Sequence, residues 1–498
     1  MKKILVAGML LSSLMLGAQE KVEEVEEVVS SKYNRNGLSF VFVNRPNGSD
    51  VKNFCDTVGV PDKFDHNVIA TKFLNVDYEG VTPVLSENIS ACVQDKNLGK
   101  EIMSYVFNRQ ENGTFDDARI LERGLYDAKD QDIRNSAAAK VKDLSFEWGE
   151  PLVNSSYVVV VDFYDSATKT EKDVTSYEVK ANAHAYKLNA GREVLDNFYA
   201  TAWADVTYSD ADRVKAMKAY DAMAFDLEYI TTVSVTGTSS SGKYVNGSMA
   251  AACQGAYDNV IYELEKKITA WKVATSIVAV RPLAAKIGKK EGVKNGDRFQ
   301  AYTYKENKDG ELESVKRGML RATVVTDNRG VSTGNTEPSY FYQISGAANI
   351  KEGYTIQQKN DLKLGGALAF GLAPLGFRVG LDMDYIAHIG KRGSITYGMI
   401  NLGANMGHGL TLFDAMIGAG YGIPVSRFFE VTPFIMGGAY LNDDFKAVAY
   451  LAEPGVRAAV TFQPFALYLS LGYQVSTLNL VVPDLLPIEA KFGLKWTF

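Results

Sequence analysis

Polar and apolar residues alternate with a period of two through the last quarter of the chain. Over residues 488–498 every second residue is apolar, and the residues between them are Glu489, Lys491, Gly493, Lys495 and Thr497. A β-strand places alternate residues on opposite faces, so this strand would have one apolar face and one charged face. The same alternation recurs over residues 377–385, 456–462 and 467–475.

Four more strands are expected over residues 362–372, 395–404, 410–422 and 429–441. Strands of about ten residues have the length that a tilted strand needs to cross a bilayer. An apolar outside with a charged inside is the arrangement of a membrane barrel and the reverse of a soluble one. The pattern therefore predicts an antiparallel transmembrane β-barrel of eight strands over residues 361–498, with six or ten strands as alternatives.

The interior of an eight-stranded barrel is only wide enough for side chains to fill it. The charged residues of the expected strands would then face one another there and form a paired network. These residues are Arg378, Asp382, Asp384, Asp414, Glu430, Glu453, Arg457, Glu489, Lys491 and Lys495. The pattern favours a packed ion-pair core that serves as a membrane anchor, and the alternative is ion conduction.

Residues 33–275 show mixed helix and strand patterns, which predict an α+β domain. Residues 157–164 form a nearly continuous apolar run, as in a strand buried on both faces. One helix carries an apolar stripe at steps of three and four, and we expect it to pack on the sheet that contains residues 157–164. The stripe comprises Cys253, Tyr257, Val260, Leu264, Ile268 and Trp271. Further strands are expected over residues 38–44, 175–186 and 229–235, and helices over residues 116–125 and 130–144.

Residues 276–360 have a different character, with short strands separated by glycines. Residues 307–310 read Asn-Lys-Asp-Gly, a good hairpin connection. This region is predicted to be a small all-β module, either a barrel or a sandwich.

The N-terminus has the layout of a secretory signal peptide over residues 1–18. Lys2 and Lys3 precede a short apolar run over residues 4–16, and small residues follow it. Residues 19–32 are rich in glutamate and are expected to be an acidic linker. The pattern predicts an exported protein.

The net charge of −6 argues against a nucleic-acid partner. After the signal peptide there is no apolar run of about 18 residues, so membrane insertion would require a closed barrel. The chain has three cysteines. Cys55 and Cys92 could form a disulfide in an oxidising compartment or remain free thiols, whereas Cys253 is expected in a helix core.

The chemistry of known enzyme and metal sites is not found. Of the four histidines, His66, His184, His388 and His408, none has a His or Cys partner at metal-ligand spacing. Residues 237–243 have the spacing of a phosphate-binding loop, but Tyr244 stands where a Ser or Thr should bind Mg²⁺, so a flexible hairpin tip is the better interpretation. We expect no catalysis, no metal and no cofactor.

The final strand resembles the assembly signal of bacterial outer-membrane proteins, which is an alternating aromatic strand that ends in Phe. The residues that carry the resemblance are Phe492, Leu494, Trp496 and Phe498. It implies insertion into outer-membrane lipid by the barrel-insertion machinery. It also implies a periplasmic C-terminus, and since an even-stranded barrel returns to the side where it began, residues 19–360 would be periplasmic too.

Residues 291–299 resemble a turn and strand of periplasmic modules in flagellar and curli-assembly proteins. The expected strand over residues 277–280, with the helix before it, is similar to the end of the curli-secretion lipoprotein domain. The Cys that anchors that lipoprotein has no counterpart here.

Together these patterns predict a non-enzymatic protein of the outer membrane. Its barrel would anchor a periplasmic domain that binds an unidentified envelope protein, in envelope organisation or assembly. A small channel or secretion component and a surface-exposed binding protein are the alternatives.

Overall fold

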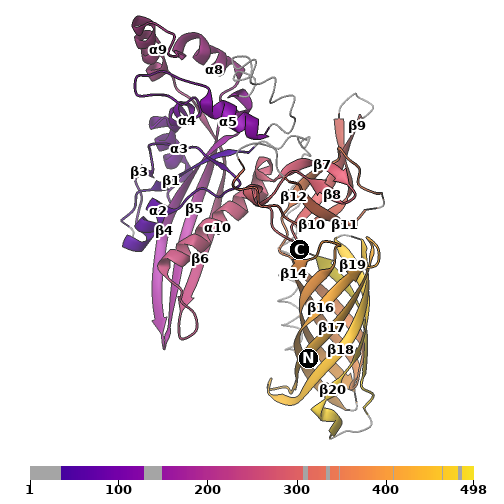
Figure 1. Ribbon diagram of the computed structural model, residues 1–498. Coiled ribbons are helices and arrows are strands. Elements are labelled where there is room, and N and C mark those ends of the chain that lie inside the picture. Colours follow the sequence, from indigo (N-terminus) through magenta and orange to yellow (C-terminus); the bar gives the residue numbers. More distant parts are fainter. Residues whose placement is uncertain are drawn as a thin grey trace.

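The computed structural model describes residues 35–46, 48–127, 149–306, 312–331, 337–346, 348–407, 409–462, 464–480 and 485–497. The predicted signal peptide, acidic linker and helix over residues 130–144 lie outside the described residues, as do His408 and Phe498. Figure 1 shows three regions in chain order: an N-terminal region, a small module, and a barrel with the module at one of its ends.

The N-terminal region is built on a mixed sheet with the strand order β2-β1-β4-β5-β6, and β3 also pairs with β1. Its strands are β1 (Gly37–Val43), β2 (Asp65–His66), β3 (Phe73–Leu74), β4 (Ser156–Glu171), β5 (Val174–Leu188) and β6 (Leu227–Ser241). Strand β1 runs parallel to β2, β3 and β4, whereas β5 runs antiparallel to its neighbours β4 and β6. The first half of β4 is buried, and its second half is exposed.

Helices cover both faces of this sheet. They are α2 (Ser49–Thr57), α3 (Ser86–Asp95), α4 (Leu98–Val106), α5 (Ala118–Asp127), α8 (Arg192–Asn197), α9 (Asp210–Ala222) and α10 (Met249–Lys267). One core lies under α2 and α10, and the other lies under α3, α4, α5, α8 and α9. The alternation within β4 divides its side chains between them, because Val159 and Val161 belong to the first core and Val158 and Val160 to the second.

Helix α10 packs on the sheet as its apolar stripe predicts. Cys253, Tyr257, Val260 and Leu264 lie in one core with Val159 of β4. The side chain of Ser248 caps the helix by accepting a hydrogen bond from the backbone N–H of Ala251 at 3.1 Å.

The segment with phosphate-loop spacing is mostly strand rather than a hairpin tip. β6 runs through Gly237 to Ser241, and the turn follows at Gly242, which bridges to Val245. A side chain at Gly237 would meet the backbone of Ala252 at 2.1 Å, so this glycine allows α10 to lie close to the sheet.

The module is a closed barrel with the strand order β10-β11-β8-β7-β12-β9. Its strands are β7 (Ala274–Val280), β8 (Leu283–Ala285), β9 (Arg298–Glu306), β10 (Leu312–Val324), β11 (Ser339–Ser345) and β12 (Thr355–Lys359). Of the two architectures that the sequence allowed, the barrel is confirmed. The hairpin pairing of β9 with β10 begins at Glu306 opposite Leu312, on either side of the predicted connection.

The C-terminal barrel is antiparallel and closes where β17 pairs with β18. Its long strands are β13 (Leu364–Ala373), β14 (Gly376–Ile389), β15 (Ile395–Gly407), β16 (Leu410–Pro424), β17 (Phe429–Leu441), β18 (Ala447–Phe462), β19 (Phe465–Tyr473) and β21 (Ile488–Thr497). The sheet has nine strands including the two-residue β20 (Val475–Ser476), which pairs only with β18, so eight strands form the barrel. The predicted fold class, an α+β region and a small all-β module followed by an eight-stranded barrel, is confirmed.

Candidate functional site: the filled barrel and its cap

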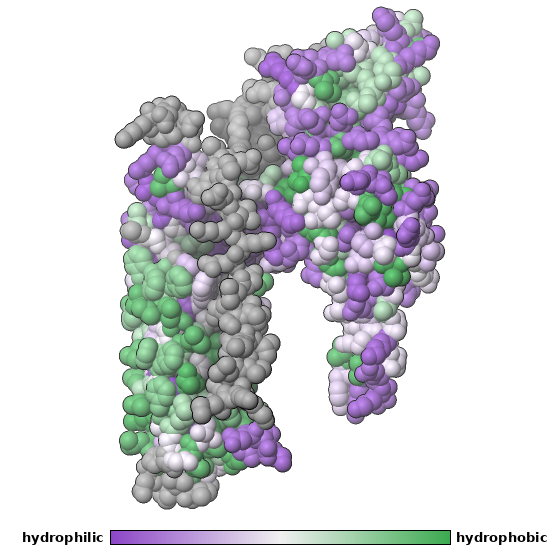
Figure 2. Space-filling view, turned by 180° about the vertical axis from the view of Figure 1, so that it is seen from behind, coloured by the Kyte–Doolittle hydropathy of each residue, from purple (hydrophilic) through white to green (hydrophobic). Residues whose placement is uncertain are grey.

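The outside of the C-terminal barrel is apolar around its middle. Figure 2 shows this surface as a green belt on the face in view, below the purple surface of the module. Its exposed large apolar side chains include Leu368, Phe370, Leu402, Ile417, Ile435, Val460, Leu467, Leu469, Phe492 and Leu494. A soluble barrel would bury such side chains, so this surface fits a barrel that faces lipid.

Aromatic residues gather toward both ends of the belt, as in the girdles of membrane barrels. At the module end these residues are Tyr385, Tyr421, Phe428, Phe462, Phe465 and Trp496. At the other end they are Phe377, Phe413, Phe445, Tyr450 and Tyr473. The belt therefore has the aromatic borders that are typical of a membrane barrel.

The part of the barrel interior nearest the module contains a cluster of charged side chains around Asp384. Asp384 accepts hydrogen bonds from Arg457 at 3.0 Å and from Lys495 at 2.6 Å. The guanidinium of Arg457 also lies 5.5 Å from the ring centres of Tyr397 and Tyr468. Because these side chains come from five different strands, they tie opposite walls of the barrel together.

The half of the interior away from the module contains a second pair, between Arg378 and Asp414. Two nitrogens of Arg378 donate to the two carboxylate oxygens of Asp414, at 3.0 and 2.8 Å. Asn405 donates to the same carboxylate at 2.6 Å. Asp382 lies 3.7 Å from Arg378 and accepts a hydrogen bond from Tyr468 at 2.7 Å.

Toward the far end, the side-chain amide of Gln474 bridges two carboxylates. It donates to Glu453 at 3.0 Å and to Glu489 at 2.5 Å, and it accepts from the hydroxyl of Tyr440 at 2.7 Å. Lys491 lies 2.8 Å from Glu489. Side chains from β17, β18, β21 and the segment after β19, which are neighbours in the barrel wall, thus meet inside the lumen.

The structure brings most of the predicted charged residues together and places one of them differently. Glu430 accepts hydrogen bonds from Tyr397 at 3.1 Å and from Thr432 at 2.9 Å, rather than from a cation. The polar residues Asn405, Tyr440, Tyr468 and Gln474 were not among the predicted set. Tyr468 and Gln474 stand at inward positions of the alternation, which is the signal that could have found them.

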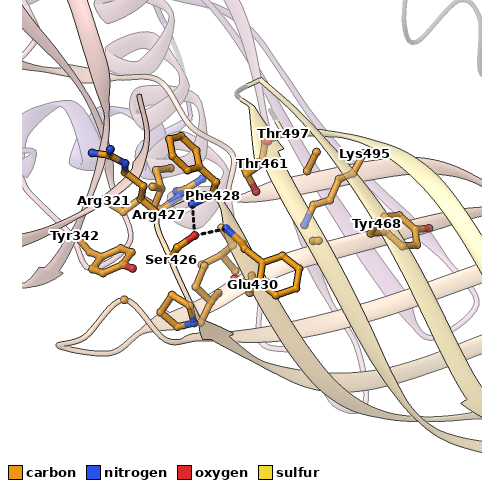
Figure 3. Close-up of a pocket in the computed structure, with 18 of the residues that line it drawn as sticks. Arg321, Tyr342, Ser426, Arg427, Phe428, Glu430, Thr461, Tyr468, Lys495 and Thr497 are labelled. Carbon is orange, nitrogen blue, oxygen red and sulfur yellow. Dashed lines mark hydrogen bonds between the residues drawn. The ribbon is translucent and has the colours of Figure 1, made fainter. Parts of the chain in front are cut away.

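The module closes the end of this barrel. Figure 3 shows Arg321 and Tyr342 of the module facing Lys495 and Tyr468 of the barrel across a small cavity. The cavity measures about 80 Å³. Arg321 is almost inaccessible, donates to the carbonyl of Gly296 at 2.7 Å and pairs with Asp361.

Specific contacts fix the module to the rim of the barrel. The side chain of Asn295 donates to the carbonyl of Ile389 at 2.8 Å and accepts from the Ile389 N–H at 2.8 Å. Arg427 donates to Asn349 at 2.6 Å. Gly393, with φ of +81°, lies under the ring of Tyr342, where a side chain would come within 2.4 Å of the ring. Nothing in the sequence pattern indicated these contacts.

The cysteines do not pair as one alternative expected. Cys55, Cys92 and Cys253 are all free. Cys55 lies in the core under α2 and α10, whereas Cys92 packs against the core on the other face of the sheet. The sheet itself separates the two thiols, so the Cys55–Cys92 disulfide is corrected to free thiols. Burial raises the pKa of Cys55 to about 12, which makes this thiol unreactive.

His184 lies in the interior of the N-terminal region. It is fully buried on β5, and its Nδ1 lies 2.7 Å from the hydroxyl of Thr232. Burial lowers its pKa to about 4, so it is neutral at pH 7. Among the described residues there is no group of three or more His, Cys, Asp or Glu side chains that could hold a metal ion.

The residues of the predicted assembly signal lie on β21. Phe492 and Leu494 are exposed on the outer face, and Trp496 packs against Phe465 with ring centres 4.9 Å apart. Phe498 lies outside the described residues. Within the described part of the chain, no helix is long and apolar enough to cross a membrane.

Comparison with known proteins yields no family model that matches this chain, and no curated protein matches it. Among solved structures it is similar to a chain from work titled "De novo design of transmembrane beta-barrels", with 15% identity and a TM-score of 0.20. The similarity covers 28% of this chain and 98% of that one. The membrane assignment rests instead on the surface and interior of the barrel itself, an architecture that fits an outer-membrane protein.

Proposed function

We propose that this chain is a non-enzymatic outer-membrane protein whose small, filled barrel anchors a periplasmic interaction region. The observation that carries the proposal is the filled lumen, in which buried side chains from different strands are bonded to one another in three groups, one of which joins opposite walls through Arg457 and Asp384. A pore would need a continuous path for water past these pairs. An anchor needs only an apolar outside and a stable inside.

The module, which caps one end of the barrel, supports the same function. Ions passing through the barrel would have to enter where the module sits, and there the cavity is only about 80 Å³. The contacts of Asn295 and Arg427 hold the module in a defined position on the rim. The N-terminal region, with two separate cores and helices on both faces of its sheet, would serve as the part that binds an envelope protein.

Ending the chain after residue 363 tests the anchor. This truncation keeps Asp361, the partner of Arg321, and removes the barrel. We expect the shortened protein in the soluble periplasmic fraction and the full chain in the outer-membrane fraction. Finding the shortened protein still in the outer membrane would contradict the barrel's role as anchor.

Planar-bilayer recording of the purified full chain tests the absence of transport. We expect no steady conductance. Reproducible single-channel steps would favour the channel alternative instead.

Protease treatment of intact cells tests the orientation. The exposed tip of the β4–β5 hairpin, residues 168–175, offers a cleavage site. We expect cleavage there only after the outer membrane is opened, and cleavage in intact cells would support a surface-exposed binding protein. Crosslinking of whole cells followed by co-purification would then identify the partner.

A further inference from the structure

A second, larger cavity opens between the module and the rim of the barrel. Its volume is about 890 Å³. The module contributes residues of β9, β10, β11 and β12, and the barrel contributes Phe428, Phe462 and Pro464 from the turns at its rim. Six cationic side chains line it: Lys266, Lys272, Arg298, Lys316, Arg317 and Lys359. No carboxylate of the described residues is part of this lining.

Several cations of this cavity have partners among the described residues. Lys266 pairs with Glu263 at 2.5 Å, and Arg298 donates to the backbone carbonyl of Asn360 at 2.9 Å. Asp361 also faces Arg298, but its carboxylate forms an ion pair with Arg321. In the described part of the chain, the buried Nε of Arg317 has no hydrogen-bond partner. The lining of the cavity is therefore cationic and can take an anion.

The barrel side of the cavity coincides with the aromatic girdle. Phe462 is about half exposed, its ring centre lies 6.1 Å from that of Phe465, and Phe465 packs on Trp496. Such girdles lie at the level of the lipid headgroups. Basic residues next to that level attract anionic headgroups, and an arginine guanidinium matches the geometry of a phosphate.

We propose that this cavity binds the phosphate headgroup of an anionic phospholipid from the leaflet next to the module. The headgroup lies among Arg298, Lys316, Arg317 and Lys359, and the acyl chains follow the apolar outer face of β18 and β19 past Phe462. The choice of a phospholipid rests on the proposed function, because that orientation places the module on the periplasmic side.

The test uses the full-length protein and a matched pair of variants. Lys316→Gln/Arg317→Gln removes two charges from the cavity, and Lys169→Gln/Lys172→Gln removes two from the exposed β4–β5 hairpin. Proteins are reconstituted in phosphatidylcholine vesicles with or without phosphatidylglycerol, released gently in detergent, and analysed by native mass spectrometry for retained lipid.

We expect the wild type to retain phosphatidylglycerol in preference to phosphatidylcholine. Each neutralised cation near an anionic headgroup should weaken retention roughly fivefold, hence about 25-fold for the cavity variant. The hairpin variant should stay within about twofold of the wild type, and Arg317→Lys should keep most of the binding.

Several results would overturn the site. Equal retention of phosphatidylglycerol and phosphatidylcholine by the wild type would contradict the proposed site. Unchanged retention of phosphatidylglycerol by the cavity variant would contradict it as well. Binding of inorganic phosphate alone at the same affinity would indicate that the ligand is a soluble anion. A preference for lipid A would indicate a lipid of the opposite leaflet. A protein adduct from a photo-crosslinker at position 317 in cells would indicate a protein partner. Insertion of the barrel is measured separately, by the change in electrophoretic mobility that a folded barrel shows on heating. A wild type that inserts but shows no lipid preference would contradict the lipid site alone. A wild type that fails to insert would contradict the anchor function as well.

Discussion

Arg378 and Asp414 form an ion pair in the barrel lumen with both side chains only 1% exposed. Two charges withdrawn from water are tolerated when each satisfies the other, but removing one partner leaves an uncompensated buried charge. We expect Arg378→Met to lower the free energy of unfolding by about 3–5 kcal/mol. Urea unfolding of the protein in lipid vesicles, followed by the gel shift on heating, measures this change.

The matched control removes both charges. Replacing a buried pair with apolar residues of similar volume is often neutral or stabilising, so Arg378→Met/Asp414→Leu should recover most of the loss. A double variant as unstable as Arg378→Met would mean that Asp414 matters chiefly through its other contact, the hydrogen bond from Asn405.

His184 gives the N-terminal region a pH dependence. Burial lowers its pKa from 6.5 to about 4, while its pKa in the unfolded chain stays near 6.5. Between these values the unfolded chain binds the additional proton, so the free energy of unfolding falls as the pH drops from 6.5 to 4 and then levels off. The shift corresponds to about 3 kcal/mol.

Urea unfolding at several pH values, followed by the fluorescence of Trp203 and Trp271, measures this dependence. In His184→Gln the amide can still contact Thr232 but does not titrate, so its profile between pH 6.5 and 4 should be flatter. Parallel profiles for the two proteins would show that other groups cause the acid sensitivity.

At the scale of elements, the strands that were easiest to predict have unbroken alternation. β21 runs over Ile488–Thr497, matching the expected strand within one residue. β18 begins at Ala447, nine residues before the expected Val456. The predicted start is late because Pro454 stands beside Gly455, and both residue types disfavour a strand. In the structure the pairing of β17 with β18 continues past these two residues.

The capping of the barrel could not be predicted from the sequence. Period-two alternation reports which face of a strand meets lipid, and it contains no information about what lies beyond the strand ends. Asn295, Tyr342 and Gly393 come from separate segments and meet only once two barrels are folded. The interior charges could be predicted as a set because all of them lie on inward positions of the strands, and closing a narrow barrel forces inward side chains together.

Asn295→Ala tests whether the cap is held by the contacts at its rim. The change removes the two hydrogen bonds between the Asn295 side chain and Ile389, so the backbone N–H and C=O of Ile389 lose these partners. Each unsatisfied group costs about 1–3 kcal/mol, so the module should detach more often and the linker over residues 360–363 should be cut faster by protease. Asn349→Ala, which removes one exposed hydrogen bond to Arg427, should have a smaller effect.

Detachment of the cap should not create a channel, because the charge pairs inside the barrel remain. Asn295→Ala is therefore expected to be silent in planar bilayers even as its linker becomes sensitive to protease. Conductance in this variant would show that the module, rather than the filled lumen, blocks passage.

At the scale of the whole molecule, the long strands of the N-terminal sheet run down beside the C-terminal barrel. In both Figure 1 and Figure 2 the end of these strands is level with the barrel wall, with a gap between them. The tip of the β4–β5 hairpin is exposed and carries Lys169, Glu171, Lys172 and Asp173. Each charge placed at the centre of a bilayer costs about 2.5–3.5 kcal/mol or more, so the tip has to avoid the lipid.

We therefore expect the N-terminal region to swing away from the barrel when the barrel enters a membrane, while the module and its cations stay on the rim. The chain joins α10 to the module through residues 268–273, where Trp271 packs in the N-terminal core and Val273 in the module core. We expect a change of backbone angles between these two residues to move the sheet as a unit and to leave the module on its rim.

Fluorophores attached at two positions distinguish this arrangement from one in which the tip enters the bilayer. Lys172→Cys labels the hairpin tip and Leu469→Cys labels the lipid-facing wall of the barrel, each in a Cys92→Ser background because Cys92 is the least buried thiol. In vesicles that contain lipids with quenching groups on their acyl chains, the label at position 469 should be strongly quenched. The label at position 172 should instead be quenched by iodide added to the water. Strong quenching of position 172 by the lipids would place the hairpin inside the bilayer and would contradict the expected movement of the N-terminal region.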